Sequence, residues 1–142
     1  MSMDAGLDTG DMIEKAEVVL AEDETGGSLF DRLAEVGAKL CVHTIQAIED
    51  GTAVYTKQNE AEATHVGMIK KQMGNIDWMQ PAVTIERLIR GLNPWPSAYT
   101  KLNGKTLKIW RAAVEAGGDA KDAGKVVTAN KKELKIQTGD GI

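Results

Sequence analysis

The sequence of 142 residues is poor in the features that mark several classes of protein. Its single cysteine, Cys41, excludes an internal disulfide and is typical of a reducing compartment. No apolar run approaches the roughly 18 residues that a membrane-spanning helix needs. No basic segment followed by an apolar one indicates a signal peptide. The two histidines, His43 and His65, have no metal-binding partners in sequence, so we expect no metal site. Together these features lead us to expect a cytoplasmic protein without membrane contact.

Charge is distributed unevenly along the chain. Residues 1–63 carry 4 basic and 14 acidic side chains, a net charge of −10. Residues 64–142 carry 13 basic and 7 acidic side chains, a net charge of +6, and the whole chain has a net charge of −4. A basic second part favours contact with a polyanion such as nucleic acid, although solvated lysines are also common on β-rich surfaces.

The chain begins with an acidic, glycine-containing stretch, MDAGLDTGDM at residues 3–12. Three carboxylates and two glycines lie within eight residues. Glycine lets the backbone turn and approach a ligand closely, while Asp and Thr side chains stabilise turns by local hydrogen bonds. The pattern predicts a tight loop that presents acidic groups and bare backbone, and an ordinary surface turn is the alternative.

The next part of the chain predicts a strand and then a long helix. Residues 13–20 alternate imperfectly and are predicted to form a strand. Residues 27–50 have apolar side chains at spacings of three and four, which predicts an amphipathic helix with a wide apolar face. Thr25 or Ser28 is its expected N-cap, and Gly51 is its expected end. Cys41 is expected to be a core residue, because it lies on the apolar face.

The remainder predicts a linker over 52–75 and then a small β-rich domain over 76–142. A helix is expected from about Pro81 to Gly91, followed by a stiff extended segment at 93–96. Asn103-Gly104 lies between two strand-like runs and predicts a hairpin, and a second hairpin is expected around 130–132. Several short strands with regular turns are typical of a small barrel or sandwich.

Four motifs carry a resemblance to a known family. They are DAGLDTGDM at 4–12, IDW at 76–78, RLIRGLNPWP at 87–96 and TGDG at 138–141. In order and spacing the sequence resembles the folate-dependent formyltransferases, and within them the methionyl-tRNA formyltransferases. The resemblance implies an α/β remnant, a strand plus a long helix of a Rossmann-like formyltransferase domain, followed by a small OB-like β-barrel.

The resemblance also implies the domain limits and the catalytic chemistry. Residues 1–51 would be the C-terminal part of the catalytic domain, 52–75 a linker, and 76–142 an OB-like barrel that is incomplete at its end. The family transfers a formyl group from formyltetrahydrofolate to an amine by means of an asparagine, a histidine and an aspartate. The aspartate falls on Asp8, whereas the asparagine and histidine have no matching position here. We therefore expect a fragment that is inactive alone. The folate-binding candidates implied by the family are Asp4, Ala5, Gly6 and Leu7.

The partner implied by the resemblance is initiator methionyl-tRNA, bound by the basic second part. Phosphate contacts from Lys and Arg give salt-dependent affinity with little sequence information. Two other hypotheses remain open: a non-catalytic RNA-binding module, and a formyltransferase that acts on another amine such as a sugar nucleotide. The helix at 27–50 would leave its apolar face uncovered, which favours association with a missing N-terminal half or with a second copy. The candidate contacts to nucleic acid are Lys70, Lys71, Lys101, Lys105, Lys108 and Arg111.

Overall fold

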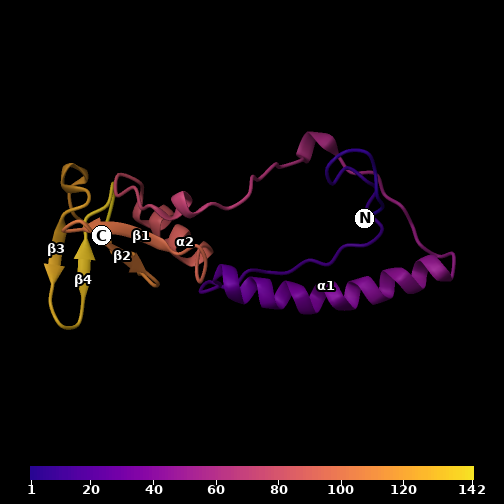
Figure 1. The fold of residues 1–142 in the computed structure, drawn as a ribbon, viewed down its shortest axis with the longest axis horizontal. Helices are drawn as coiled ribbons and strands as arrows, with labels where there is room; N and C mark the ends of the chain where they lie inside the picture. Colours follow the sequence, from indigo (N-terminus) through magenta and orange to yellow (C-terminus); the bar gives the residue numbers. More distant parts are fainter. The chain divides into compact units, whose positions relative to one another are not determined.

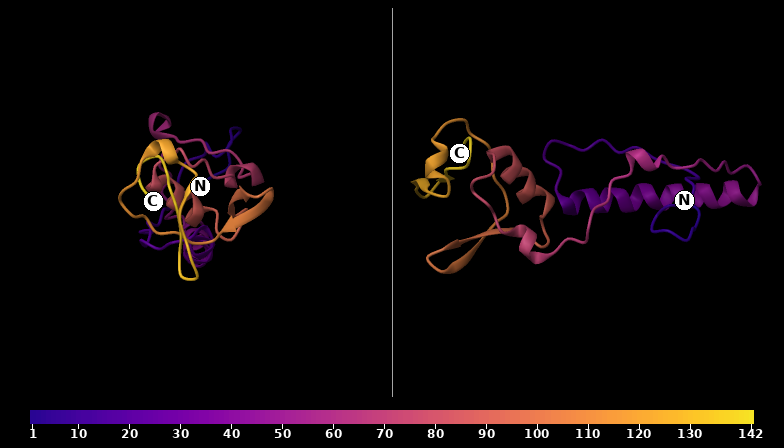
Figure 2. Two further views of the ribbon diagram at one scale, coloured as in Figure 1. Left: turned by 90° about the vertical axis from the view of Figure 1, so that its left-hand side faces the viewer. Right: turned by 90° about the horizontal axis from the view of Figure 1, so that it is seen from above.

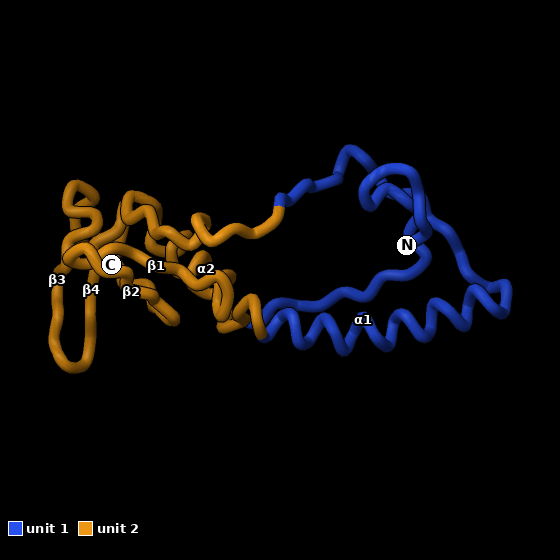
Figure 3. Tube along the Cα trace, in the orientation of Figure 1, with its two compact units in different colours: residues 1–21, 28–67 blue, residues 22–27, 68–142 orange.

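A computed structural model describes all residues, 1–142, as two compact units. Unit 1 comprises residues 1–21 and 28–67, and unit 2 comprises residues 22–27 and 68–142, as coloured in Figure 3. Figure 1 labels the helices and strands along the chain. Each unit is described separately below.

Helix α1 (Gly26–Glu49) is the main element of unit 1, and Figure 2 shows it as one unbroken helix. The prediction of a helix over 27–50 is therefore confirmed. Gly51 follows at a φ of 71°, the left-handed conformation in which glycine ends a helix without steric cost. Thr25 occupies the position just before the helix, as one N-cap prediction required, whereas Ser28 lies inside the helix.

The apolar face of α1 lies open, because no residue of this helix is buried. Phe30 is 72 % exposed and Val42 is 70 % exposed. Cys41 is also exposed, so the prediction that it is a core residue is wrong. Cys41 lies on the part of the apolar face that stays exposed, whereas Leu29, Val36 and Leu40 of the same face are half-buried. No helix in the structure has the length and apolar character needed to cross a membrane.

The strand predicted over residues 13–20 does not form. A strand needs a hydrogen-bonded neighbour, and unit 1 offers this segment none. Pairing is limited to an antiparallel bridge just before it, in which Met12 and Thr56 exchange both backbone hydrogen bonds at 2.8 Å. The segment is attached to α1 by side chains at two points. Glu14 contacts His43 and Thr44, and the Arg32 guanidinium donates to the carbonyl of Val19 at 3.2 Å.

Unit 2 contains a small hydrophobic core around helix α2 (Ala82–Gly91). Ile85 and Ile89 of this helix are buried together with Ile76 and Ala98. The half-buried Trp78 packs against this cluster, and its indole Nε1 donates to the hydroxyl of Thr100 at 3.0 Å. Two short 3₁₀ turns fall in the stretch predicted to be a linker: η1 (Glu60–Glu62) belongs to unit 1, and η2 (Lys71–Gly74) belongs to unit 2 and lies against the first strand.

The stretch from Leu92 to Pro96 differs from its prediction. A stiff extended segment was expected at 93–96, but these residues form turns, and both Asn93-Pro94 and Trp95-Pro96 are cis. Ser97 N–H donates to the carbonyl of Leu92 at 2.9 Å and closes the turn. The chain must reverse here because Leu92 and Ala98 are both buried in the same small unit.

The strands of unit 2 form two antiparallel hairpins. Strands β1 (Ala98–Leu102) and β2 (Lys105–Ile109) flank Asn103-Gly104, whose φ values of 49° and 77° fit the predicted two-residue turn. Strands β3 (Val126–Ala129) and β4 (Leu134–Ile136) form the second predicted hairpin, with a register irregularity between Val126 and Thr128. A third 3₁₀ turn, η3 (Ala120–Asp122), precedes it. The two hairpins remain separate two-stranded sheets, and no closed barrel is formed.

The TGDG motif at 138–141 forms a tight turn beside α2. The hydroxyl of Thr138 donates to the carbonyl of Gly141 at 2.7 Å and accepts from the Gly141 N–H at 3.1 Å. The turn directs the Asp140 carboxylate at the start of α2, where it accepts the Ala82 N–H at 2.7 Å. A residue 58 positions downstream thereby caps a helix that has no side-chain cap of its own at Pro81.

Candidate functional site

The acidic stretch at residues 3–12 forms a loop that is stabilised mainly by side chains. The Asp4 carboxylate accepts the Ala5 N–H at 2.7 Å through Oδ1 and the Thr9 hydroxyl at 3.2 Å through Oδ2. Ser2 N–H donates to the carbonyl of Asp11 at 2.8 Å and closes the base of the loop. The predicted tight loop is present, and Asp4 serves the loop itself as a turn-stabilising acid.

The positive φ in this loop is found at an aspartate instead of a glycine. Asp8 has a φ of 55°, while Gly6 and Gly10 do not have a positive φ. A non-glycine residue in the left-handed region costs roughly 1–2 kcal/mol, although Asp tolerates it better than most residues. This conformation sets the direction in which the exposed Asp8 carboxylate leaves the backbone.

At both glycines of the loop, an added Cβ would meet neighbouring atoms. Gly10 is buried, and a Cβ there would collide with the carbonyl oxygen of Ser2. A Cβ on Gly6 would collide with the side chain of Thr9. Close backbone approach is one of the two properties of glycine that the sequence pattern suggested, and it is the property that this loop uses.

The four residues that precede Asp8 present their backbone to solvent. Asp4, Ala5, Gly6 and Leu7 are all exposed, and Leu7 is 80 % exposed. The N–H groups of Gly6 and Leu7 make no hydrogen bond within the protein. Free N–H groups on an exposed turn are available to donate hydrogen bonds to a bound molecule.

Gln58 supports the loop from the segment predicted to be a linker. Its side-chain Nε2 donates to the carbonyl of Asp8 at 2.8 Å and to that of Gly10 at 2.7 Å. The Met12–Thr56 bridge lies two residues away and holds the two segments together. Gln58 was not identified from the sequence, because a glutamine in a polar stretch without periodicity carries no signal of its partner 50 residues earlier.

Glu14 forms the second support, just after the loop. Its carboxylate accepts the Thr44 hydroxyl at 2.5 Å and lies 2.5 Å from Nδ1 of His43. The hydrogen bond from Thr44 is the main cause that lowers the pKa of Glu14 below its ordinary value; desolvation opposes it, and the interaction with His43 lowers the pKa further. His43 is exposed, and its ring pairs with the carboxylate of Glu14.

The six basic candidates all lie in unit 2, but they do not form a single cluster. Lys101 and Lys108 share one face of the β1–β2 hairpin, because Lys101 is opposite Thr106 and Lys108 is opposite Tyr99. Lys105 pairs with Leu102 and therefore lies on the other face. Lys70 and Lys71 are exposed at the start of η2, which lies next to β1.

The basic face of the hairpin includes an aromatic side chain. Lys108 Nζ lies 5.5 Å from the centroid of the Trp110 ring, within the range of a cation–π interaction. Trp110 is 49 % exposed, so its ring is available for stacking. Trp95 is 59 % exposed and lies in the 92–96 turns. The lysine face, defined as Tyr99, Lys101, Thr106 and Lys108, thus combines charge with a neighbouring aromatic ring.

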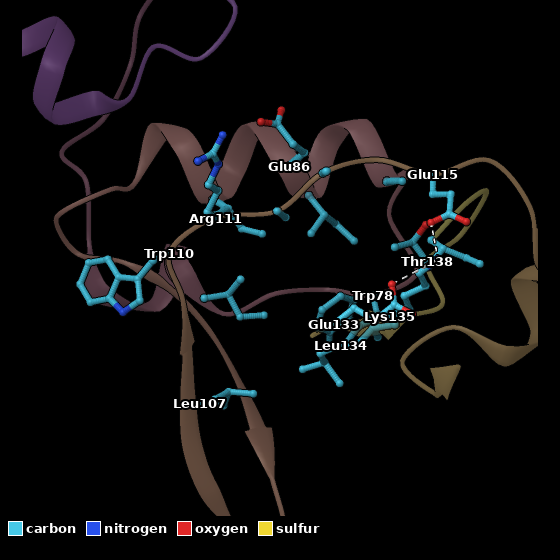
Figure 4. A pocket seen from close by; sticks show the side chains of 18 of the residues that line it. Trp78, Glu86, Leu107, Trp110, Arg111, Glu115, Glu133, Leu134, Lys135 and Thr138 are labelled. Carbon is cyan, nitrogen blue, oxygen red and sulfur yellow. Dashed lines mark ion pairs between the residues drawn. The ribbon is translucent and has the colours of Figure 1, made fainter. Parts of the chain in front are cut away.

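A pocket of about 660 Å³ opens between α2, the segment after β2 and the chain end (Figure 4). Its floor is apolar, with Ile85, Ile89 and Leu107 among the lining residues, and Lys108 and Arg111 lie at its edge. Lys135 is neutralised by Glu115 at 2.6 Å, a contact that raises the lysine pKa. Lys108 and Arg111 form no ion pair, so both basic candidates at this pocket remain available to bind an anion.

Comparison with known proteins gives closely similar relatives over nearly the whole chain. It is 62 % identical over 141 residues to the methionyl-tRNA formyltransferase of Agathobacter rectalis, covering 99 % of this chain and 46 % of that protein. It is 49 % identical over 146 residues to the enzyme of the same name from Lachnospira eligens, again covering 99 % and 46 %. The enzyme of that name from Clostridioides difficile is 42 % identical over 142 residues, covering 100 % and 46 %.

The chain thus spans about half the length of the curated relatives it matches. A crystal structure of a HypX variant from Aquifex aeolicus has a similar fold, with a TM-score of 0.66 at 20 % identity, covering 97 % of this chain and 25 % of that one. Residues 68–142 match the family model described as formyl transferase, C-terminal domain. Because this match includes more than half of the chain, the protein belongs to the formyl transferase family.

Proposed function

We propose that this chain is part of a methionyl-tRNA formyltransferase, which transfers a formyl group from formyltetrahydrofolate to the amino group of methionyl initiator tRNA. The observation that carries the proposal is the 62 % identity to the Agathobacter rectalis enzyme across nearly the whole chain. Motifs from both units contribute to it, so the similarity is not limited to one shared domain. Translation initiation in the cytoplasm is part of the same proposal.

The proposal assigns a chemical role to the loop of unit 1. Attack of an amine on a formyl carbon develops negative charge on oxygen and requires a proton to leave the amine. The Asp8 carboxylate would set the charge state of the family's catalytic histidine, which transfers the proton, either by direct contact or through a water molecule. The folate supplies the formyl group, and Asp4, Ala5, Gly6 and Leu7 would bind its ring through their exposed backbone. The asparagine and histidine implied by the family have no counterpart in this chain, so the chain alone would be inactive.

The proposal assigns tRNA binding to unit 2. The lysine face, together with Lys70 and Lys71 at η2 next to β1 and with Arg111 at the pocket, would contact phosphates. Lys105 lies on the other face of the hairpin, so it would contact a different part of the tRNA from Lys101 and Lys108. The division into 1–51, 52–75 and 76–142 and the OB-like assignment of the last part remain proposals, supported by two hairpins around one helix.

The open apolar face of α1 supports association with the part of the enzyme that this chain does not span. More than half the length of each relative lies outside the match, and an exposed stripe with residues such as Phe30 and Val42 favours burial. A second copy of the chain is the alternative partner.

A chimaera tests the enzymatic proposal. The matched residues of the Agathobacter rectalis enzyme are replaced by this chain, and formylation of methionyl-tRNA by formyltetrahydrofolate is measured. We expect an active chimaera whose rate falls about 100-fold or more on Asp8→Asn, the size typical of a lost acid–base group. A folded but inactive chimaera contradicts the proposal. If the chain then still binds tRNA with strong salt dependence, the RNA-binding module is the better assignment.

A further inference from the structure

Gln58 makes the most specific contact to the loop that carries Asp8. Its side chain crosses from the segment after α1 and donates both amide hydrogens of one Nε2, to the carbonyls of Asp8 and Gly10 at 2.8 and 2.7 Å. These two carbonyls bracket Thr9, so the contact fixes the backbone on both sides of the turn. No other side chain outside the loop donates to Asp8 or Gly10.

The loop has a particular need for such a contact. Asp8 is held at a φ of 55°, a conformation that persists only where surrounding contacts determine it. The contacts of Asp4 with Ala5 and Thr9 lie within the loop and are exposed, so they compete with water. Gln58 is half-buried, its hydrogen bond to Gly10 is partly shielded from solvent, and it supplies a constraint from outside the loop on the carbonyl of Asp8 itself.

We propose that Gln58 is a positioning residue that holds Asp8 in its left-handed conformation and thereby aims the Asp8 carboxylate. The kinetic consequence of this inference rests on the proposed function. The effect of Gln58 on the backbone conformation of Asp8 can be tested independently of that function. The amide must present nitrogen to the two carbonyls, since two carbonyl oxygens can accept only from a donor. The Met12–Thr56 bridge brings Gln58 within reach but leaves the Asp8 carbonyl untouched.

The chemistry of glutamine permits a sharp choice of variants. Gln58→Glu keeps the size and shape of the side chain, removes both donors and places a carboxylate against two carbonyl oxygens. Gln58→Ala removes the side chain. If Gln58 only fills space, the glutamate variant resembles the wild type; if it positions the loop, the glutamate variant is at least as disturbed as the alanine variant.

Gln46→Glu is the matched control. Gln46 is an exposed residue of α1 in the same unit, and its Nε2 donates to the Asp50 carboxylate at 3.1 Å. The substitution makes the same change of charge and also removes a donor, but it does not touch the loop. The helical circular-dichroism signal of α1 reports whether each variant remains folded.

Backbone NMR and amide hydrogen exchange on the 142-residue chain test the structural content. We expect Gln58→Glu and Gln58→Ala to move the chemical shifts of Asp8 out of the left-handed range and to speed exchange at residues 4–11. Gln46→Glu is expected to leave both unchanged. Unchanged Asp8 shifts in the glutamate variant of Gln58, or equal changes in the control, would overturn the proposal.

The same variants in the chimaera test the kinetic consequence. We expect kcat to fall by roughly tenfold to 100-fold, because a small misplacement of a reacting group has effects of that size, while KM for methionyl-tRNA stays within about twofold. A parallel rise in KM for the tRNA with unchanged kcat would contradict a role in aiming Asp8. An inactive wild-type chimaera would refute the proposed function and leave the NMR result to decide on Gln58.

Discussion

Asp140 offers the clearest test of how a distant motif stabilises unit 2. Its carboxylate accepts the Ala82 N–H at 2.7 Å, at the first residue of α2, and Pro81 supplies no side-chain cap. Loss of a capping acceptor costs about 0.5–2 kcal/mol, and loss of a negative charge at a helix N-terminus costs about 0.3–1 kcal/mol. We therefore expect Asp140→Ala to lower the free energy of unfolding by about 1–2 kcal/mol, and Asp140→Asn, which keeps an acceptor oxygen, by about 0.5 kcal/mol.

Tryptophan fluorescence during urea or thermal denaturation measures this effect. All three tryptophans of the chain, at positions 78, 95 and 110, lie in unit 2, so their emission reports that unit alone. A loss of 1 kcal/mol lowers Tm by roughly 4–8 °C for a unit of this size. Asp31→Asn, at an exposed position of α1 without a hydrogen-bond partner, makes the same change of charge and should not alter the tryptophan transition. An Asp140→Ala transition that coincides with the wild type would refute the capping argument.

Three further predictions concern single contacts. Gly10→Ala should disorder the acidic loop, because the added Cβ collides with the Ser2 carbonyl, and loss of protection of the loop amides in hydrogen exchange would show it. Glu14 has a lowered pKa, so its contribution to stability is complete above the ordinary value of 4.5 and is lost as the pH falls through the lower, folded-state value; an NMR titration in which Glu14 protonates at or above the ordinary value would contradict this. Thr100→Val removes the acceptor of the Trp78 indole N–H and should cost about 1 kcal/mol in the tryptophan transition, and a stability equal to that of the wild type would show that the bond contributes nothing.

Those elements that depend on neighbouring residues were predictable from the sequence. The spacing of apolar residues over 27–50 predicted α1, since helical hydrogen bonds lie within the segment. Asn103-Gly104 predicted the β1–β2 hairpin, because a turn with two positive φ values needs those residue types. The acidic loop was likewise predictable as a turn from Asp4, Gly6 and Thr9, which contact one another within five residues.

The features that depend on distant or absent partners were not predictable in the same way. The alternation over 13–20 indicated a strand, but no neighbouring strand lies beside it in unit 1. The apolar stripe of α1 indicated a core position for Cys41, but Cys41 lies on a part of the helix that stays exposed. Gln58 and Asp140 act over separations of 50 and 58 residues, which no local pattern encodes. The family resemblance implied Asp8 as the catalytic aspartate, but the sequence did not indicate that Asp8 has a positive φ.

The two attachments of residues 14–19 to α1 relate the length of this segment to the length of the helix between the contacts. From Glu14 to Val19 the chain advances five residues, or about 17 Å at full extension. The helix residues that they contact, Thr44 and Arg32, are twelve positions apart, which corresponds to a rise of about 18 Å. The extended length of the segment and the helical rise between its two contacts are therefore similar, although the segment belongs to no sheet.

This match of lengths links the register of the segment to the position of the acidic loop. Deleting one residue between the two attachments shortens the chain by about 3.4 Å, equivalent to about two residues of helical rise. The chain can then keep Val19 on Arg32 or Glu14 on Thr44, but not both at their present length. If the Arg32 contact is kept, the loop that ends at Met12 is drawn along the helix and away from Thr56 and Gln58. The unpaired segment thus sets where the loop lies along α1 through its length and through the side-chain contact of Glu14.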